Sequence, residues 1–77
     1  MALPEMTEMQ KRMYEAVGHV VEIKLKDDQR RFIGKCTGYT KPLDNEPEIA
    51  TMDLRVEGVQ FIYEFAEAEI ENIIIRE

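Results

Sequence analysis

After Gly18 the chain alternates apolar and polar residues, which is the two-residue period of a half-buried β-strand. A first strand is expected over about residues 19–26, and Asp27-Asp28 then supplies turn residues. A second strand is expected over about residues 30–39. Gly34 interrupts it, and a glycine inside a strand is typical of a sharp bend or a close backbone approach. Strongly bent strands are the means by which a short chain closes a small barrel.

Three further strands are predicted before the chain ends. The third covers about residues 49–56, and Glu57-Gly58 then predicts a two-residue hairpin turn, because glycine adopts a positive φ without strain. A short 3₁₀ turn at about 66–69 leads to the last strand, at about 70–75. The fourth strand, between the hairpin turn and the 3₁₀ turn, alternates through Val59, Phe61, Tyr63 and Phe65.

The region before Gly18 has the spacing of a helix, expected over about residues 5–17. The helix starts either at Pro4 or one turn later, where Thr7 and Gln10 match a capping box. Glu8 and Arg12 are expected to form an ion pair on its surface. Its apolar stripe either packs on the barrel or binds a partner, and consists of Met6, Met9, Met13, Ala16 and Val17.

The hydrophobic positions resemble those of the Sm-like family. Val21-x-Ile-x-Leu, a turn and Phe32-x-Gly-x-Cys36 resemble the first Sm motif, and Phe61-x-Tyr-x-Phe followed by Ile70-x-x-Ile-x-Ile75 resembles the second. The segment from Gly18 to Lys35 is also similar to the C-terminal Sm-like domain of bacterial ribosome maturation factors. The resemblance implies a mainly β fold with an N-terminal helix, a five-stranded, strongly bent antiparallel barrel of Sm-like or, more broadly, SH3-like kind.

Length and composition set further bounds. A chain of 77 residues allows one domain, 1–77, with the barrel over about 19–76 and a thin core. The core is expected to contain Phe32, Cys36, Met52, Leu54, Phe61, Phe65, Ile70 and Ile73. The single cysteine forms no intramolecular disulfide, so we expect a cytoplasmic setting. One cysteine and one histidine also cannot build a four-ligand zinc site, and we expect no metal or cofactor. No stretch approaches about 18 apolar residues, and the N-terminus lacks the features of a signal peptide, so no membrane partner is expected.

The candidates for chemistry are few, and no catalytic residue is expected. Cys36 and His19 are a conceivable nucleophile and base, but they lie on different predicted strands without a third orienting group, and a small buried cysteine is the favoured interpretation. One basic cluster either attracts an anion such as RNA or is a solvated hairpin surface, and consists of Lys24, Lys26, Arg30, Arg31 and Lys35. An acidic group at the other end consists of Glu64, Glu67, Glu69 and Glu71.

RNA binding is disfavoured by two departures from the RNA-binding Sm proteins. Those proteins carry an Arg-Gly or Lys-His pair before the last strand, whereas this chain has Ala66-Glu-Ala-Glu69. Asp44 and Asn45 lie between prolines and beyond the spacing of the usual base-reading pair. The net charge of −6 also opposes binding to phosphate. We therefore assign no RNA-pocket role to any residue.

Self-association is the favoured mode of action. In Sm-like rings the fourth strand of one subunit pairs with the fifth of its neighbour, and the resemblance implies the same here for the Val59–Phe65 and Ile70–Ile75 strands. Ile73, Ile74 and Ile75 place apolar side chains on both faces of the last strand, which makes a bare edge an aggregation hazard. The competing interpretation is a monomer whose methionine face covers these isoleucines. Two functions are thus predicted, a non-enzymatic scaffold that forms a homo-oligomer or, alternatively, an RNA-associated protein; the partner, the ring size and the process stay open.

Overall fold

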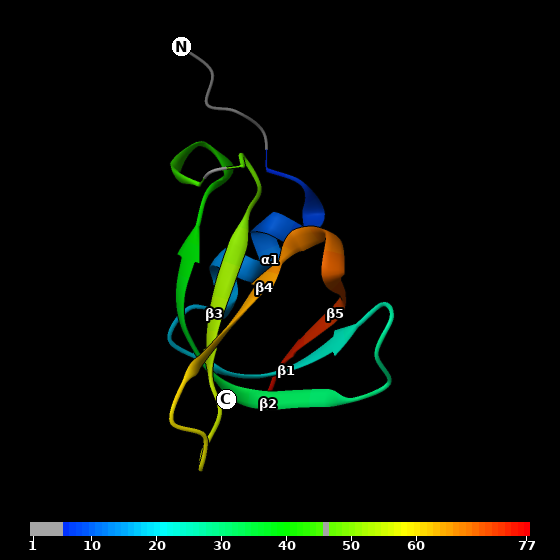
Figure 1. The fold of residues 1–77 in the computed structure, drawn as a ribbon, viewed down its shortest axis with the longest axis vertical. Helices are drawn as coiled ribbons and strands as arrows, with labels where there is room; N and C mark the ends of the chain where they lie inside the picture. Colours follow the sequence, from blue (N-terminus) through cyan, green and yellow to red (C-terminus); the bar gives the residue numbers. More distant parts are fainter. Residues whose placement is uncertain (1–5, 46) are drawn as a thin grey trace.

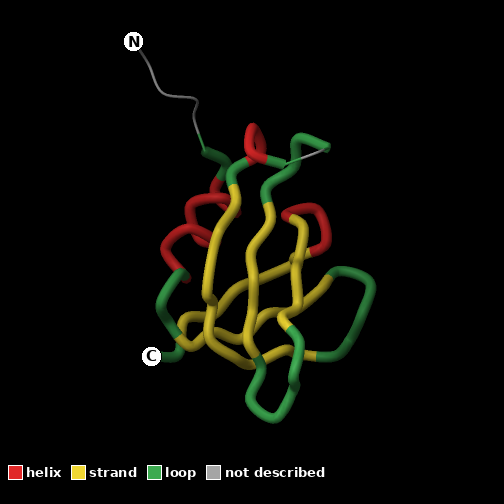
Figure 2. Tube along the Cα trace, turned by 60° about the vertical axis from the view of Figure 1, so that its left-hand side comes forward, coloured by secondary structure: helices red, strands yellow, loops and turns green. Residues whose placement is uncertain are grey.

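One helix and five antiparallel strands form the chain in the computed structural model, which describes residues 6–45 and 47–77. All five strands belong to one sheet, in the order β4-β3-β2-β1-β5 (Figure 1; Figure 2). The predicted class, mainly β with an N-terminal helix and five antiparallel strands, is confirmed. The elements are α1 Glu8–Ala16, β1 Val20–Leu25, β2 Arg31–Thr40, a 3₁₀ turn Pro42–Asp44, β3 Thr51–Arg55, β4 Ile62–Ala66, a second 3₁₀ turn Glu67–Glu69, and β5 Ile70–Ile75.

The ends of α1 follow from capping residues. Thr7 is the N-cap, and its hydroxyl accepts from the backbone N–H of Gln10 while the Gln10 side chain accepts from the N–H of Thr7, so the later of the two predicted starts is confirmed. Pro4, the other predicted start, lies outside the described residues. Gly18 ends the helix with a φ of +86°, a left-handed conformation that glycine adopts without strain.

β2 is the strand that bends the sheet. It runs beside β1 and then turns to run beside β3, so the two halves of the sheet lie in different directions (Figure 1). The pairing with β3 shifts register between Cys36 and Gly38, which makes Thr37 the extra residue of a β-bulge. Cys36 faces the core before the bulge, and Tyr39, which pairs with buried Met52, faces it afterwards. The face that the strand turns to the core therefore changes at this bulge.

Gly34 lies where the end of β3 crosses β2. A Cβ atom added to Gly34 would stand 2.3 Å from the carbonyl oxygen of Arg55 and 3.1 Å from the Cα atom of Val56. A side chain does not come that close to a backbone, so a larger residue would push the two strands apart. The close backbone approach predicted from this glycine is confirmed.

The core receives apolar side chains from the helix and from every strand. Met13 and Ala16 of α1 are fully buried and Met9 packs at the margin, so the methionine stripe lies against the sheet. Phe32, a predicted core residue, is only partly buried. The predicted core residues that are buried are Cys36, Met52, Leu54, Phe65, Ile70 and Ile73.

The prediction that Phe61 is buried is wrong, because its side chain is 59% exposed. A two-residue hairpin turn would place Phe61 opposite Leu54, whereas Leu54 pairs with Tyr63. The register is therefore displaced by two residues from the predicted one. A displacement of two keeps Phe61 on the inward face but moves it beyond the end of the core.

The loop between β3 and β4 explains this register. Gly58 has the predicted positive φ, +84°, and the N–H of Val59 donates to the carbonyl of Val56 at 3.1 Å, so a tight turn forms at Glu57-Gly58. Strand pairing does not start beside this turn, however, and begins only with Arg55 opposite Ile62. The predicted two-residue hairpin is therefore a longer loop that projects from the barrel, at the lower end of Figure 1.

We expect Gly34→Ala to lower the free energy of unfolding by about 1–3 kcal/mol, because its methyl group would collide with the Arg55 carbonyl. Thermal denaturation measures this as a loss of several degrees in Tm. Gly38→Ala is the matched control, since a Cβ there would meet only Asp53 Oδ2, at an ordinary 3.5 Å. Equal losses in the two variants would contradict the role assigned to Gly34.

Candidate interaction surface

The two ends of the sheet are its open edges, β4 and β5. These are the strands that carry the residues predicted for assembly, although Val59 and Phe61 precede β4 rather than belonging to it. Apolar side chains remain exposed on both, with Ile62 at 50% beside Phe61 on one edge, and Ile74 at 44% and Ile75 at 46% on the other. Exposed apolar residues on an unpaired edge strand favour pairing with a strand of another chain.

A row of aromatic rings follows the inward face of β4. The ring centroids of Phe61 and Tyr63 lie 4.9 Å apart, and those of Tyr63 and Phe65 lie 5.8 Å apart with the rings stacked. Phe32 of β2 packs beside this row, 5.0 Å from Tyr63 and 5.2 Å from Phe65. The row therefore runs from the buried Phe65 to the exposed Phe61, out of the core and onto the surface.

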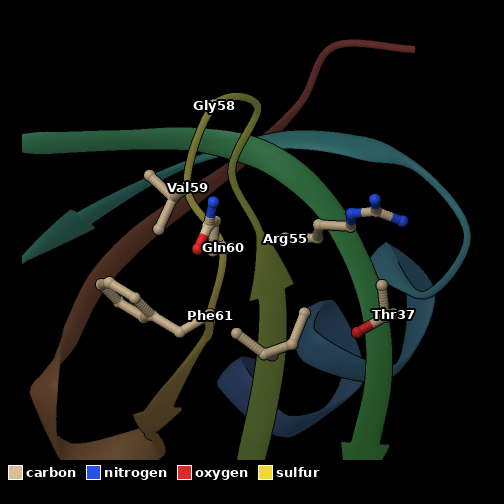
Figure 3. Close-up of a pocket in the computed structure, with 7 residues that line it drawn as sticks. Thr37, Arg55, Gly58, Val59, Gln60 and Phe61 are labelled. Carbon is tan, nitrogen blue, oxygen red and sulfur yellow. The ribbon is translucent and has the colours of Figure 1, made fainter.

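An open depression lies beside the start of β4. It has a volume of about 650 Å³ and is lined by Gly58, Val59, Gln60, Phe61 and Ile62, together with Thr37 and Arg55. Figure 3 shows Val59 and Phe61 projecting to one side of the loop and Thr37 to the other. A second hollow, of about 470 Å³, lies near the start of α1 and includes Met9 and Ile49.

β5 differs from β4 because α1 donates a hydrogen bond to its backbone. The Arg12 guanidinium donates to the backbone carbonyl of Ile73, so the predicted ion pair of Arg12 with Glu8 is replaced by this bond, and Glu8 lies 3.5 Å from Lys11 instead. The methionine face of α1 packs into the core and leaves Ile74 and Ile75 exposed.

The predicted basic cluster is largely neutralised within the chain. Arg31 lies 2.5 Å from Glu22, Lys24 lies 2.6 Å from Glu71, and Arg30 lies 2.6 Å from Asp28. Arg30 also stacks on Phe32, with 5.3 Å between the guanidinium carbon and the ring centroid. The remaining members, Lys26 and Lys35, make no ion pair with any residue that the structure describes. The cluster therefore offers an anion less positive charge than its sequence suggests.

Glu22 is a buried carboxylate on the outer face of β1. One oxygen accepts from Arg31 of β2 at 2.5 Å, and the other accepts from Arg76, just after β5, at 2.8 Å. The bond from Arg31 is the main reason that the pKa of the Glu22 carboxyl lies below its ordinary value of 4.5; burial opposes this shift and the bond from Arg76 adds to it. These two hydrogen bonds, called the Glu22 clamp below, join three neighbouring strands. Sequence reasoning missed it, because alternation along one strand does not show which charges lie opposite on the next.

The acidic turn before β5 fastens the helix. Glu67 accepts from the Thr7 hydroxyl at 2.6 Å and from the Gln10 side-chain amide at 2.8 Å, which places a carboxylate at the positive N-terminus of α1. Glu69 accepts from the N–H of Ala66 at 2.9 Å and so caps its own turn. These glutamates have structural partners, which the sequence alone did not reveal. In the other loop, Asn45 donates to the carbonyl of Ile49 at 2.7 Å.

Cys36 and His19 do not form a catalytic pair. The Cys36 thiol is buried, lies 3.5 Å from the carbonyl of Gly38, and has a raised pKa because of burial. The His19 ring instead lies against the carbonyl of Glu77, with Nδ1 at 3.1 Å. Among residues 6–45 and 47–77, no three histidine, cysteine or acidic side chains gather in a way that would hold a metal ion.

Comparisons with known proteins add no relative. No family model matches the chain, and no curated protein or solved structure is significantly similar to it. Within the described part of the chain, α1 and the 3₁₀ turns are too short to span a bilayer. The surface is therefore interpreted from its own geometry.

We expect Glu22→Gln to lower Tm at pH 7, because it removes the charge that two arginines share. Folding lowers the pKa of Glu22, so this stabilisation is present above the unfolded-state pKa of about 4.5 and is lost as the pH falls through the folded-state value. The difference in Tm between the two proteins should thus narrow below about pH 4.5. Glu15→Gln, an exposed carboxylate without an ion pair in the described chain, is the control. A pH-independent difference would contradict the clamp.

Proposed function

We propose that the protein is a non-enzymatic scaffold module of Sm-like kind that acts in the cytoplasm through self-association and protein contacts. The observation that carries this proposal is the pair of open sheet edges, each with exposed apolar side chains. Ile62 and Phe61 at one edge and Ile74 and Ile75 at the other would be satisfied by a neighbouring strand. A core as thin as this one also gains stability from a partner subunit.

The Sm-like assignment is supported by the bent strand. Its motif residue Gly34 lies at the crossing of β2 and β3, which is the position where a small barrel needs a residue without a side chain. The strand order also leaves β4 and β5 at the edges, as edge pairing between subunits requires. The single thiol, Cys36, is buried and reduced, which favours the cytoplasm.

We expect the unmodified protein to have a mass above the 9.0 kDa of one chain in size-exclusion chromatography with light scattering, at concentrations of tens of micromolar. Replacing Ile62 and Ile74 together with Lys should reduce the mass to one chain, because charges at sheet edges block strand pairing. Ile33→Lys is the matched control, since Ile33 is 47% exposed but lies on the central strand β2. A mass of one chain for the unmodified protein would refute self-association.

RNA association is the second candidate function. It is favoured by the exposed ring of Phe61 beside Tyr63, since bases stack on exposed aromatic side chains. Lys26 and Lys35, which form no ion pair with a described residue, also favour it. The ion pairs of Lys24, Arg30 and Arg31 weigh against it.

For this second candidate we expect U-rich and A-rich oligonucleotides to bind weakly, with a Kd above about 1 µM at physiological salt. The affinity should fall further as salt is added. Fluorescence anisotropy measures the binding. Replacing Lys26 and Lys35 with Ala should abolish what remains, whereas Lys11→Ala, which removes a charge already paired with Glu8, should not. Submicromolar binding that survives the double replacement would instead favour a specific RNA site.

A further inference from the structure

The two edges of the sheet are not equally available to a partner. Antiparallel strands alternate between residues that bond across the ladder and residues whose N–H and C=O point away from it. On β5, the N–H of Arg76 donates to the carbonyl of Val20 of β1. By this alternation, the backbone N–H and C=O of Ile73 point away from β1. Its carbonyl is the group that Arg12 of α1 already occupies. A second chain pairing with β5 would have to displace this bond.

The same alternation shows what β4 presents. The N–H of Glu67 donates to the carbonyl of Ala50 at 2.9 Å, in continuation of the register between β3 and β4. The backbone groups of residues 65 and 63 therefore bond to β3. The backbone N–H and C=O groups of Ala66, Glu64 and Ile62 point away from it. Ala66 agrees, because its N–H donates to the Glu69 side chain. No other described residue bonds to the outward backbone of Glu64 or Ile62.

We propose that β4 pairs with β4 of a second copy of the chain, antiparallel, about a two-fold axis that passes through Ile62. The proposal rests on self-association and names the interface that forms it. Around this axis the two Ile62 residues exchange backbone hydrogen bonds, and Phe61 of each copy lies opposite Tyr63 of the other. Gln60 then lies opposite Glu64 of the second copy, an amide donor facing a carboxylate.

Side-chain chemistry selects this register. An axis through Glu64 would bring two like charges together, which is unfavourable for residues directly opposite. An axis through Tyr63 would set Phe61 against Phe65, which is already buried, and Ile62 against a glutamate. The axis through Ile62 covers the exposed side chains of Ile62 and Phe61 and continues the aromatic row across the interface. Each copy uses the same strand, so the contact closes as a dimer instead of growing into a ring.

Single edge variants test the interface by light scattering at a fixed concentration of the full chain. Ile62→Lys should reduce the mass from two chains to one, whereas Ile74→Lys and Ile33→Lys should leave the dimer intact. Loss of association in the Ile74→Lys variant as well, or a wild-type mass above two chains, would show head-to-tail pairing of β4 with β5 and overturn the two-fold arrangement. A wild-type mass of one chain would refute the proposed function itself, so the two failures are distinguishable.

Disulfide trapping provides a second measurement that does not depend on tolerance of a buried charge. Opposite residues that exchange backbone hydrogen bonds in an antiparallel pair, as the two Ile62 residues would, have Cα atoms about 5.5 Å apart, a separation that a disulfide can bridge. Ile62→Cys should therefore form a covalent dimer under mild oxidation, seen on a non-reducing gel. Ile74→Cys is the matched control, and the unmodified chain shows the background from the buried Cys36. Equal trapping of Ile62→Cys and Ile74→Cys would overturn the proposed axis.

Discussion

The contact between Gly34 and the backbone of Arg55 determines how the rest of the sheet is arranged. It lets the end of β3 cross β2 at a distance that excludes any side chain. Together with the bulge at Thr37, it turns one sheet into two halves that enclose the core. Without this crossing, the helix would have no enclosed surface on which to bury Met13 and Ala16.

The bend also explains why the sheet has two open edges, β4 and β5, with exposed apolar side chains. A sheet that closes only partly keeps two edges. Here the helix donates a hydrogen bond to β5, whereas no described residue bonds to the outward backbone of Ile62 or Glu64 on β4. The aromatic row on β4 links the core to the open edge, from the buried Phe65 to the exposed Phe61. One continuous row of rings therefore contributes both to the core and to the exposed surface.

Features set by local chemistry were predictable from the sequence. The cap at Thr7, the helix end at Gly18 and the close approach at Gly34 each depend on what one residue permits. The two edge strands were expected from the resemblance to the Sm-like family, because the order of the elements alone does not place β5 beside β1. Features that depend on which residues meet across strands were not. The register that exposes Phe61 is of this kind, since a loop of several residues leaves it free to shift by two.

Long-range polar partners were also beyond the sequence pattern. Nothing in the order of residues indicates that Arg12 bonds to β5, that Arg31 and Arg76 share Glu22, or that Glu67 fastens the helix. The sequence pattern placed Arg12 in an ion pair on the helix surface, Arg31 in the basic cluster and Glu67 in the acidic group. Each of these bonds instead joins two different elements, and all except the bond from Arg31 to Glu22 join elements that are far apart along the chain.

The bond between Glu67 and the start of α1 has a consequence for how the molecule opens. Glu67 begins the short turn that joins β4 to β5, so the helix is tied to the same corner from which the last strand departs. Fraying of α1 would release this corner and the Arg12 contact together, whereas β5 would remain paired with β1. β4, held by its pairing with β3 and by Phe65 in the core, would stay in place, so the edge proposed for pairing would persist in a partly opened chain.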